Sequence, residues 1–399
     1  MKSKSRLLSI VQSKTALEKA WRVIQENART STSEKTKTEV DKFAEHATRN
    51  INSLSTPLSK RSFKFGEATG ILAAKVNSDG TKNKKKSRPL VLAPLTSRIV
   101  QRAILDALGT VPELLEYAEN PFSFGGIRKQ QNELAAVPAA VQAVLGAIGG
   151  GATHVAFADI TAFFTKIPKA TVVSIVAEAV QDTEFMVLFE EAIRVELENM
   201  AQLKKNASLF PIESIGVAQG NSLSPLLGNI LLHEFDRLMN DGDCTCIRYI
   251  DDFIILAPSL AAARSRLKLA VRILSEFKMS LSEEKSISTP IPVTKKFDFL
   301  GIEFNNGFIR PSGKAIGRLE ANVEKRLLDS AKTMRTTKPG DQIPRHFSLI
   351  ATLSRVDGII RGWGKHYRFC NDDALFARVD NKMNELIGKY LGAVDVYRV

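Results

Sequence analysis

The strongest constraint on this chain is an acidic pair, Asp251-Asp252, that interrupts a mostly apolar stretch. Residues 246–249 lead into the pair, and the apolar run 253–256 follows it. Short apolar runs on both sides of turn residues predict two buried strands joined by a tight turn, with the carboxylates at the turn. Because Asp is also common in solvated turns, this pair alone does not identify a site.

A second carboxylate has a matching setting in the sequence. His154–Asp159 is predicted to be a strand that ends in Asp159, and Phe163-Phe164 follows it. Strand-end carboxylates brought together in one sheet can hold a pair of Mg²⁺ ions roughly 3.5–4 Å apart. Such a pair activates a 3′-hydroxyl and stabilises the leaving pyrophosphate. The combination therefore predicts nucleotidyl transfer.

Several segments, in the right order, resemble the motifs of reverse transcriptases of the bacterial group II intron-like lineage. Tyr249-Ile-Asp-Asp resembles the Tyr-X-Asp-Asp box, and Phe157-Ala-Asp-Ile-Thr-Ala-Phe-Phe resembles the first aspartate motif. The segment 216–230 is similar to the Gly-X-Pro-Gln-Gly motif between them, although Ala218 stands where the family usually has proline. The resemblance runs from about Ser87 to Tyr390.

This resemblance implies an α+β fold, the right-hand polymerase, in which fingers and palm contain an antiparallel sheet flanked by helices and the thumb is α-helical. We expect a helical N-terminal extension over 1–60 and fingers over 61–152, with 168–215 as a further candidate part of the fingers. The palm with the catalytic aspartates is expected over 153–309, and the helical thumb over 310–399.

The resemblance also implies roles for individual residues. Asp159, Asp251 and Asp252 are the expected catalytic residues, and together with Ile160 they are the expected ligands of two Mg²⁺ ions, with Mn²⁺ as an alternative. In the family, an aromatic residue at the position of Phe164 lies beneath the sugar and excludes a 2′-hydroxyl, which implies deoxynucleotide substrates. Nucleotide-binding candidates are Arg88, Phe164, Gln219 and Lys285, and nucleic-acid-binding candidates are Lys86, Arg128, Gly301, Arg361, Lys365 and Arg368.

The charge balance favours a polyanionic partner. The chain has 56 Lys and Arg against 43 Asp and Glu, a formal net charge of +13. Residues 310–399 contain 17 of the basic and 10 of the acidic residues. Basic residues that neutralise phosphates release counterions, so this charge balance favours a polyanion. The family resemblance implies that the partners are an RNA template, expected to be a structured noncoding RNA, together with a cDNA product and dNTPs. A basic protein with no such partner is the alternative.

Cysteine content and apolar runs exclude some other classes. Cys244, Cys246 and Cys370 lack the spacing of a disulfide framework or a zinc site. No apolar run approaches the roughly 18 residues of a membrane span, and the N-terminus lacks a signal-peptide pattern, so we expect a cytoplasmic protein with no membrane partner. The oligomeric state is open.

Three biological readings of the chain are compatible with these motifs. The first is a domesticated reverse transcriptase in bacterial antiphage defence. The second is a group II intron-encoded maturase and reverse transcriptase. The third is an RNA-binding protein without polymerase activity, which the intact Asp159, Asp251 and Asp252 disfavour.

Local patterns predict further elements. We expect loops over Ala28–Thr38 and the basic segment Lys82–Arg88, and one long helix over Asp182–Asn206. Ser224 is expected to cap a helix whose first residue is Pro225, and Ser259 is expected to cap the amphipathic helix that follows the hairpin. Inward positions are expected at Leu260, Ala263, Leu267, Val271, Leu274 and Phe277 of one helix. A small helical domain is expected in the C-terminal region, from the periodic apolar residues Leu319, Val323, Leu327, Ile350, Leu353 and Ile360.

Overall fold

The computed structural model describes residues 6–29, 31, 33–76, 82–126, 134–283, 286, 289–338 and 341–395, without the side chains of residues 75, 76, 82–86 and 395. The chain divides into two compact units. The first comprises Met1–Ala73 and Arg88–Ile291, and the second comprises Ala74–Ser87 and Pro292–Val399. Helices accompany antiparallel strand pairs, so the predicted α+β class is confirmed.

The sheet of the first unit has the strand order β4-β5-β3-β6. Its strands are β3 (His154–Asp159), β4 (Thr245–Tyr249), β5 (Asp252–Ala257) and the short β6 (Ile291–Pro292). β5 is antiparallel to both β3 and β4. The predicted strand ending in Asp159 and the predicted hairpin around Asp251-Asp252 are therefore confirmed, and they are neighbours in one sheet.

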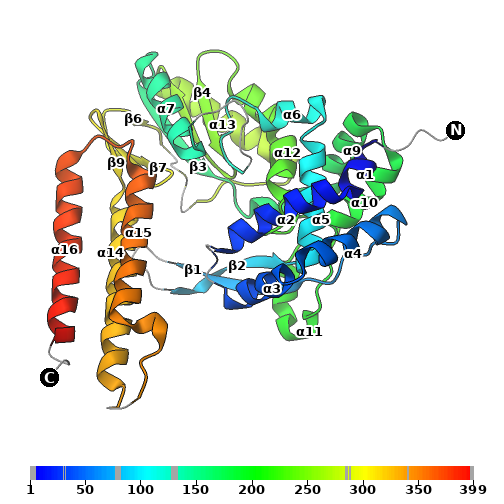
Figure 1. Ribbon diagram of the computed structural model, residues 1–399. Coiled ribbons are helices and arrows are strands. Elements are labelled where there is room, and N and C mark those ends of the chain that lie inside the picture. The colour runs from blue at the N-terminus through cyan, green and yellow to red at the C-terminus, as the bar shows by residue number, and fades with distance from the viewer. Residues whose placement is uncertain are drawn as a thin grey trace. The chain divides into compact units, whose positions relative to one another are not determined.

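The two faces of this sheet have different surroundings. Cys246, Phe253, Ile255, Ala156 and Ala158 share one hydrophobic core with helices α12 (Ser224–Met239) and α13 (Leu260–Glu276). Successive strand residues point to opposite faces, so Asp159 and its register partner Asp252 lie on the face away from this core. Helix α7 (Ala136–Gly149) packs against β4 and β5 (Figure 1).

The remaining elements of the first unit are mostly helical. They are α1 (Arg6–Gln12), α2 (Lys14–Arg29), α3 (Glu34–Ala44), α4 (Ala47–Ser59), α5 (Leu95–Leu108), α6 (Pro112–Ala118), α8 (Phe163–Lys166), α9 (Lys169–Val180), α10 (Thr183–Ile193), α11 (Met200–Leu203) and the 3₁₀ helix η1 (Lys204–Leu209). β1 (Thr69–Val76) and β2 (Lys82–Leu92) form a separate two-stranded sheet, of which residues 74–76 and 82–87 belong to the second unit.

The N-terminal helices brace α5. α1 and α2 pack against it, and their buried residues belong to the same core as those of α5. Glu39 of α3 accepts hydrogen bonds from the backbone N–H of Leu95 at 3.0 Å and from Arg98 at 2.7 Å. The first of these bonds satisfies an N–H group in the first turn of α5, which has no partner within its own helix. These contacts give the N-terminal helices a structural role.

Two predicted local structures are wrong in the N-terminal and middle segments. Most of the predicted loop Ala28–Thr38 is helical, because Ser33 caps α3 through its side chain and the helix starts at Glu34. The predicted helix Asp182–Asn206 ends at Ile193, and residues 194–197 then lie outside any helix before a turn leads into α11. There Leu197 is buried and pairs with Ala68, and this packing outweighs the helical pattern.

Three further details also differ from the sequence prediction. Lys82–Arg88 belongs to β2 and is not a loop, because the backbone pairs with β1. Ser224 is the first residue of α12, and its hydroxyl donates to the carbonyl of Ala218 at 2.8 Å, so it does not cap the helix. Val271 is 51% exposed although its spacing predicted an inward position, whereas Ser259 does cap α13 as predicted.

The second unit contains a three-stranded sheet and three long helices. β8 (Ile302–Asn305) lies between β7 (Phe297–Phe299) and β9 (Phe308–Pro311), all antiparallel. Asn306 and Gly307 both have positive φ, as a tight hairpin turn requires. The helices are α14 (Gly313–Thr336), α15 (Leu349–Tyr367) and α16 (Asp373–Asp395), with the 3₁₀ helix η2 (Arg345–Phe347) before α15.

The three helices share a small core. The predicted small helical domain is present, and Leu319, Val323 and Leu327 of its periodic apolar pattern are buried in this core. Ile350 of the same pattern is 81% exposed, because it lies in the first turn of α15 outside the helix contacts. The division into fingers, palm and thumb stays a prediction, since the two compact units have different boundaries.

Neighbouring leucines of α14 allow a matched stability test. Leu327 is 4% exposed and Leu328 is 61% exposed. We expect Leu327→Ala to lower the free energy of unfolding by about 2–5 kcal/mol, because it leaves a cavity. Leu328→Ala should change it by less than about 0.5 kcal/mol. In a Trp21→Phe background Trp363 is the only tryptophan, so its fluorescence during urea denaturation reports the second unit. Equal effects of the two substitutions would contradict this packing.

Candidate active site

The turn between β4 and β5 has an unusual backbone. Ile250 has a φ of 61°, in the left-handed region that β-branched residues avoid. Tyr249 before it and Asp252 after it are register partners, so Ile250 and Asp251 form a two-residue turn. Positive φ is what a hairpin of this length needs in order to match the twist of its strands. The sequence therefore places a strained residue next to the acidic pair.

The strand register brings three carboxylates together. Asp159 at the end of β3 lies opposite Asp252 at the start of β5. Carboxylate oxygens of Asp159, Asp251 and Asp252 lie within 4.8 Å of one another. Asp159 is buried, and the other two are half-buried.

Backbone hydrogen bonds fix the acidic cluster from a second direction. The N–H of Ile160 donates to the carbonyl of Asp251 at 2.9 Å, which ties the end of β3 to the turn. The carbonyl of Asp159 accepts from the N–H of Ser282 at 2.7 Å, and the N–H of Asp159 donates to the hydroxyl of Ser286 at 3.3 Å. Both the backbone N–H and the backbone carbonyl of Asp159 are therefore held by the segment after α13.

This donor set fits hard divalent cations. Mg²⁺ binds oxygen ligands and is commonly held by one or two carboxylates with additional water and substrate oxygens. Three carboxylates at mutual distances below 4.8 Å, on a sheet face away from the main core, supply such ligands. The carboxylates of Asp159, Asp251 and Asp252 would hold the ions, and the backbone carbonyl of Ile160 adjoins them in sequence.

The loop Gly216–Gly220 lies beside two other predicted site residues. The N–H of Val217 donates to the carbonyl of Phe164 at 2.7 Å, and the carbonyl of Gln219 accepts from the N–H of Val91 at 2.9 Å. A Cβ on Gly220 would lie 2.9 Å from the Val91 carbonyl oxygen. The loop thus joins the segment of Phe164 to the strand that carries the exposed Arg88.

Burial affects the protonation of two residues in β4. It raises the pKa of the Tyr249 phenol above its usual value. It also raises the pKa of the Cys246 thiol, and the nearby Asp236 carboxylate acts in the same direction. Both groups are therefore protonated at neutral pH, and Tyr249 keeps a hydroxyl that can donate a hydrogen bond.

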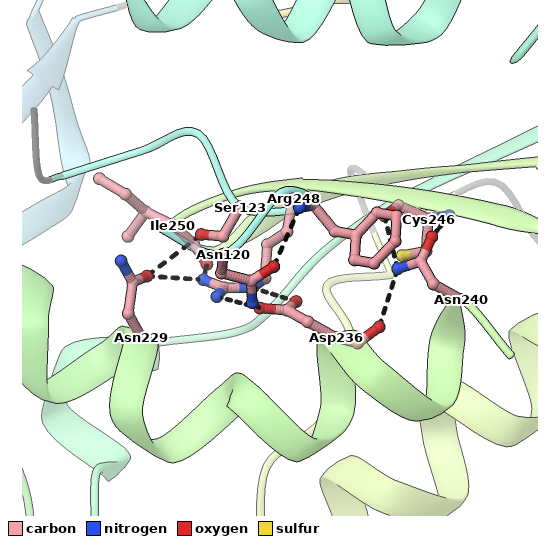
Figure 2. A network of polar contacts seen from close by, with 9 residues as sticks. Asn120, Ser123, Asn229, Asp236, Asn240, Cys246, Arg248 and Ile250 are labelled. Atoms are coloured by element: carbon pink, nitrogen blue, oxygen red, sulfur yellow. Dashed lines mark hydrogen bonds and ion pairs between the residues drawn. The ribbon is translucent and has the colours of Figure 1, made fainter. Parts of the chain in front are cut away.

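The sequence prediction missed a buried polar network beneath the turn. Arg248 and Asp236 form an ion pair of 2.6 Å, with exposed side-chain fractions of 0% and 1% (Figure 2). One signal was available: Arg248 is a basic residue in an otherwise apolar strand. The spacing of Asn229 and Asp236, seven residues apart on α12, also places both on one helix face.

The remaining predicted residues are not brought to this cluster by the described contacts. Arg128 and Lys285 lie outside the described residues, as does the side chain of Lys86, whose backbone belongs to β2. In the second unit, Gly301 has a φ of 78° in the turn between β7 and β8. Arg361, Lys365 and Arg368 lie at or near the end of α15 with exposed side chains, and Arg361 is paired with Asp357 at 2.8 Å.

No helix within the described ranges combines the length and the apolar character needed to cross a bilayer.

Comparison with protein families supports the motif assignment. The model of the family "Reverse transcriptase (RNA-dependent DNA polymerase)" matches residues 79–304, more than half of the chain. This range contains all three clustered aspartates and the Gly216–Gly220 loop.

Individual relatives are distant. The chain is 26% identical over 259 residues to the protein YkfC of Escherichia coli, covering 55% of this chain and 64% of that protein. It is 28% identical over 159 residues to the group II intron-encoded protein LtrA of Lactococcus lactis, covering 40% of this chain and 24% of LtrA. The chain thus spans less than two thirds of the length of these curated relatives.

Among solved structures, a telomerase from Candida albicans, in complex with a fragment of telomeric RNA, matches with a TM-score of 0.41 and 11% identity. The match covers 83% of this chain and 58% of the telomerase chain.

Proposed function

We propose that this protein synthesises DNA on an RNA template. The premise is that the chain belongs to the reverse transcriptase (RNA-dependent DNA polymerase) family. The observation that carries this proposal is the cluster of Asp159, Asp251 and Asp252, whose carboxylate oxygens lie within 4.8 Å of one another. Three clustered carboxylates repel one another, which disfavours the fold. A protein that used this fold only to bind RNA would have no need of such a cluster at the ends of neighbouring strands.

The proposed chemistry divides between the site and its bound ions. When bound, Mg²⁺ or Mn²⁺ supplies charge stabilisation for the attacking and leaving oxygens. Asp159, Asp251 and Asp252 orient these ions, with Ile160 as a candidate backbone ligand. The protein otherwise contributes position, since phosphoryl transfer needs little covalent chemistry from side chains.

We assign Phe164 to the choice of sugar. Its carbonyl is bonded to Val217, so the residue is anchored beside the loop of Gln219. An aromatic ring at this position leaves no room for a 2′-hydroxyl, which favours dNTPs. Gln219 and Arg88 lie on backbone segments that pair with each other. In the sequence Lys285 stands between Ser282 and Ser286, which both bond Asp159. We therefore retain these three residues as nucleotide contacts.

For the template we propose a structured noncoding RNA. The net charge of +13 and the basic residues of 310–399 support binding to phosphates. Exposed Arg361, Lys365 and Arg368 are candidate contacts in this segment, with Gly301, Lys86 and Arg128 as further candidates. Recognition of an A-form duplex through its phosphates and 2′-hydroxyls would read shape more than sequence.

The biological setting we propose is bacterial antiphage defence, on the basis of the motif resemblance alone. A group II intron maturase with polymerase activity is the second candidate, favoured by the similarity to LtrA. Plating of phages on cells that carry either the wild-type chain or its Asp251→Asn variant distinguishes the defence role from the maturase role. The defence role predicts fewer plaques with the wild-type chain than with the variant, whereas intron splicing predicts no such difference.

The aspartate cluster provides the main test of the activity. We expect Asp159→Asn and Asp251→Asn each to lower the rate of dNTP incorporation in a primer-extension assay by about 10³-fold or more, because bound metal supplies several kcal/mol of stabilisation. Binding of Mn²⁺, followed by electron paramagnetic resonance, should weaken in parallel. RNA affinity should not fall, since neither change removes a positive charge.

Glu113→Gln is the matched control for these variants. Glu113 is an exposed acid of α6 in the same unit, and its substitution changes the net charge by the same amount. Wild-type extension rates in either aspartate variant would reject the assignment of the site.

The choice of sugar gives a second prediction. Phe164→Val should open space beneath the sugar and raise the ratio of ribonucleotide to deoxynucleotide incorporation by about tenfold or more. The control is Phe308→Val, which truncates a 49% exposed phenylalanine in the other unit. The measurement is single-nucleotide extension with each substrate, and an unchanged ratio would place sugar selection elsewhere.

The template proposal predicts what RNA the protein holds in cells. Crosslinking followed by sequencing should recover one dominant noncoding RNA, with cDNA that maps to part of it. The Asp251→Asn variant should recover the same RNA without cDNA. RNA recovered in proportion to cellular abundance would show generic binding and remove the proposal of a dedicated template.

A further inference from the structure

A fully buried ion pair lies beneath the acidic turn, on the core face of the sheet. Arg248 of β4 donates from Nε to Oδ1 of Asp236 at 2.7 Å and from Nη2 to Oδ2 at 2.6 Å. This two-point contact fixes the plane of the guanidinium group. Because β4 residues alternate between faces, the Arg248 side chain points toward α12, as Figure 2 shows.

The third nitrogen of Arg248 reaches the turn itself. Nη1 donates to the backbone carbonyl of Ile250 at 3.0 Å and to Oδ1 of Asn229 at 3.3 Å. Ile250 is the residue with a φ of 61°, one position before Asp251. A β-branched residue is strained in this region and persists there only where the surroundings hold it. The guanidinium therefore bonds the strained peptide directly.

A second segment closes over the turn and is bonded to the same network. Asn120 donates to Oδ2 of Asp236 at 2.8 Å, and Ser123 donates to Oδ1 of Asn229 at 3.2 Å. The backbone of Arg248 also pairs with this segment, through N–H to the carbonyl of Phe122 at 2.8 Å.

Gly125 completes this closure. A Cβ added there would lie 2.6 Å from Cγ1 and 2.8 Å from the backbone nitrogen of Ile250. The absence of a side chain at Gly125 lets the backbone of the 120–126 segment approach the turn closely. Ile250 is thus confined between this segment and the Arg248 guanidinium.

Stability alone does not account for a buried pair at this position. Replacing a buried ion pair by apolar residues of similar volume is often neutral or stabilising. Leucine and methionine could occupy this place beside the apolar residues of α12. What apolar side chains cannot supply is a planar group that bonds α12 and the Ile250 carbonyl at the same time.

We propose that Arg248, fixed by Asp236, is a positioning residue that holds the Ile250 turn in its left-handed conformation and thereby sets the direction of the Asp251 and Asp252 carboxylates. Its catalytic meaning rests on the function proposed above. Its effect on the turn and on cation binding does not depend on that function. Asn229 and Asn120 orient the pair and leave its charge unchanged.

The test removes the pair without leaving a lone buried charge. The double variant Arg248→Met/Asp236→Leu replaces both charged groups by apolar side chains and should fold, as circular dichroism and thermal unfolding would show. We expect backbone amides of 250–253 to exchange hydrogen about tenfold faster or more, and Mn²⁺ binding to weaken by about 10- to 100-fold. In primer extension kcat should fall by a similar factor, with little change in KM for dNTP.

The matched control is Arg237→Met/Glu234→Leu. This pair lies on the same helix at 2.6 Å, but its side chains are 60% and 58% exposed and contact no part of the turn in the described structure. Amide hydrogen exchange at 250–253, Mn²⁺ affinity and the rate of primer extension should all stay at wild-type values.

A conservative change and a rescue distinguish positioning from general support. Arg248→Lys keeps the charge but loses the planar fork, so it should share the defects in milder form. Adding Ile250→Gly should restore part of the Mn²⁺ affinity in the Arg248→Met/Asp236→Leu background, because glycine adopts positive φ without strain. A role in packing alone predicts no rescue.

Each outcome decides the proposal. Folded Arg248→Met/Asp236→Leu protein with wild-type exchange at 250–253 and wild-type Mn²⁺ affinity would overturn it. If that variant does not fold, the Arg248→Lys comparison decides by the same two measurements. Wild-type protein that extends no primer would contradict the proposed function, whereas the exchange and Mn²⁺ measurements would still decide the role of Arg248.

Discussion

The pairing of β3 with β5 is the constraint on which the site depends. Its register places Asp159 opposite Asp252, and a shift by one residue would turn one of these acids toward α12 and α13. The register is enforced by the core, because Ala156, Ala158, Phe253 and Ile255 must face α12 and α13. Burial of apolar side chains on one face therefore determines where the charged groups meet on the other.

Sequence reasoning was most successful where the pattern is local. The strand ending in Asp159, the hairpin around Asp251-Asp252 and the cap at Ser259 follow from apolar runs and turn residues, and the structure has each of them. The aspartates could also be grouped from sequence, because family motifs linked segments that are far apart in the chain. Their grouping in space agrees with that expectation.

The sequence predictions are wrong where tertiary contacts outweigh the local preference of the chain. The segment after Ile193 has helical spacing, but burial of Val195 and Leu197 draws it into an extended path beside Ala68. The polar network of Arg248 was also beyond local patterns, since its partners come from α12 and from the 120–123 segment. Ser224 looked like a helix cap, yet its hydroxyl bonds the carbonyl of Ala218, at the position where the family usually has proline.

The discontinuity of the second unit has a consequence for synthesis of the chain. Its first segment, Ala74–Ser87, leaves the ribosome before the roughly 200 residues of Arg88–Ile291, and its partner segment begins only at Pro292. At about 5–20 residues per second, the early segment waits roughly 10–40 seconds for the rest of its unit. Its sequence suits such a delay: lysines dominate residues 82–86, so the segment can remain hydrated and resist non-specific association while its partner is still being made.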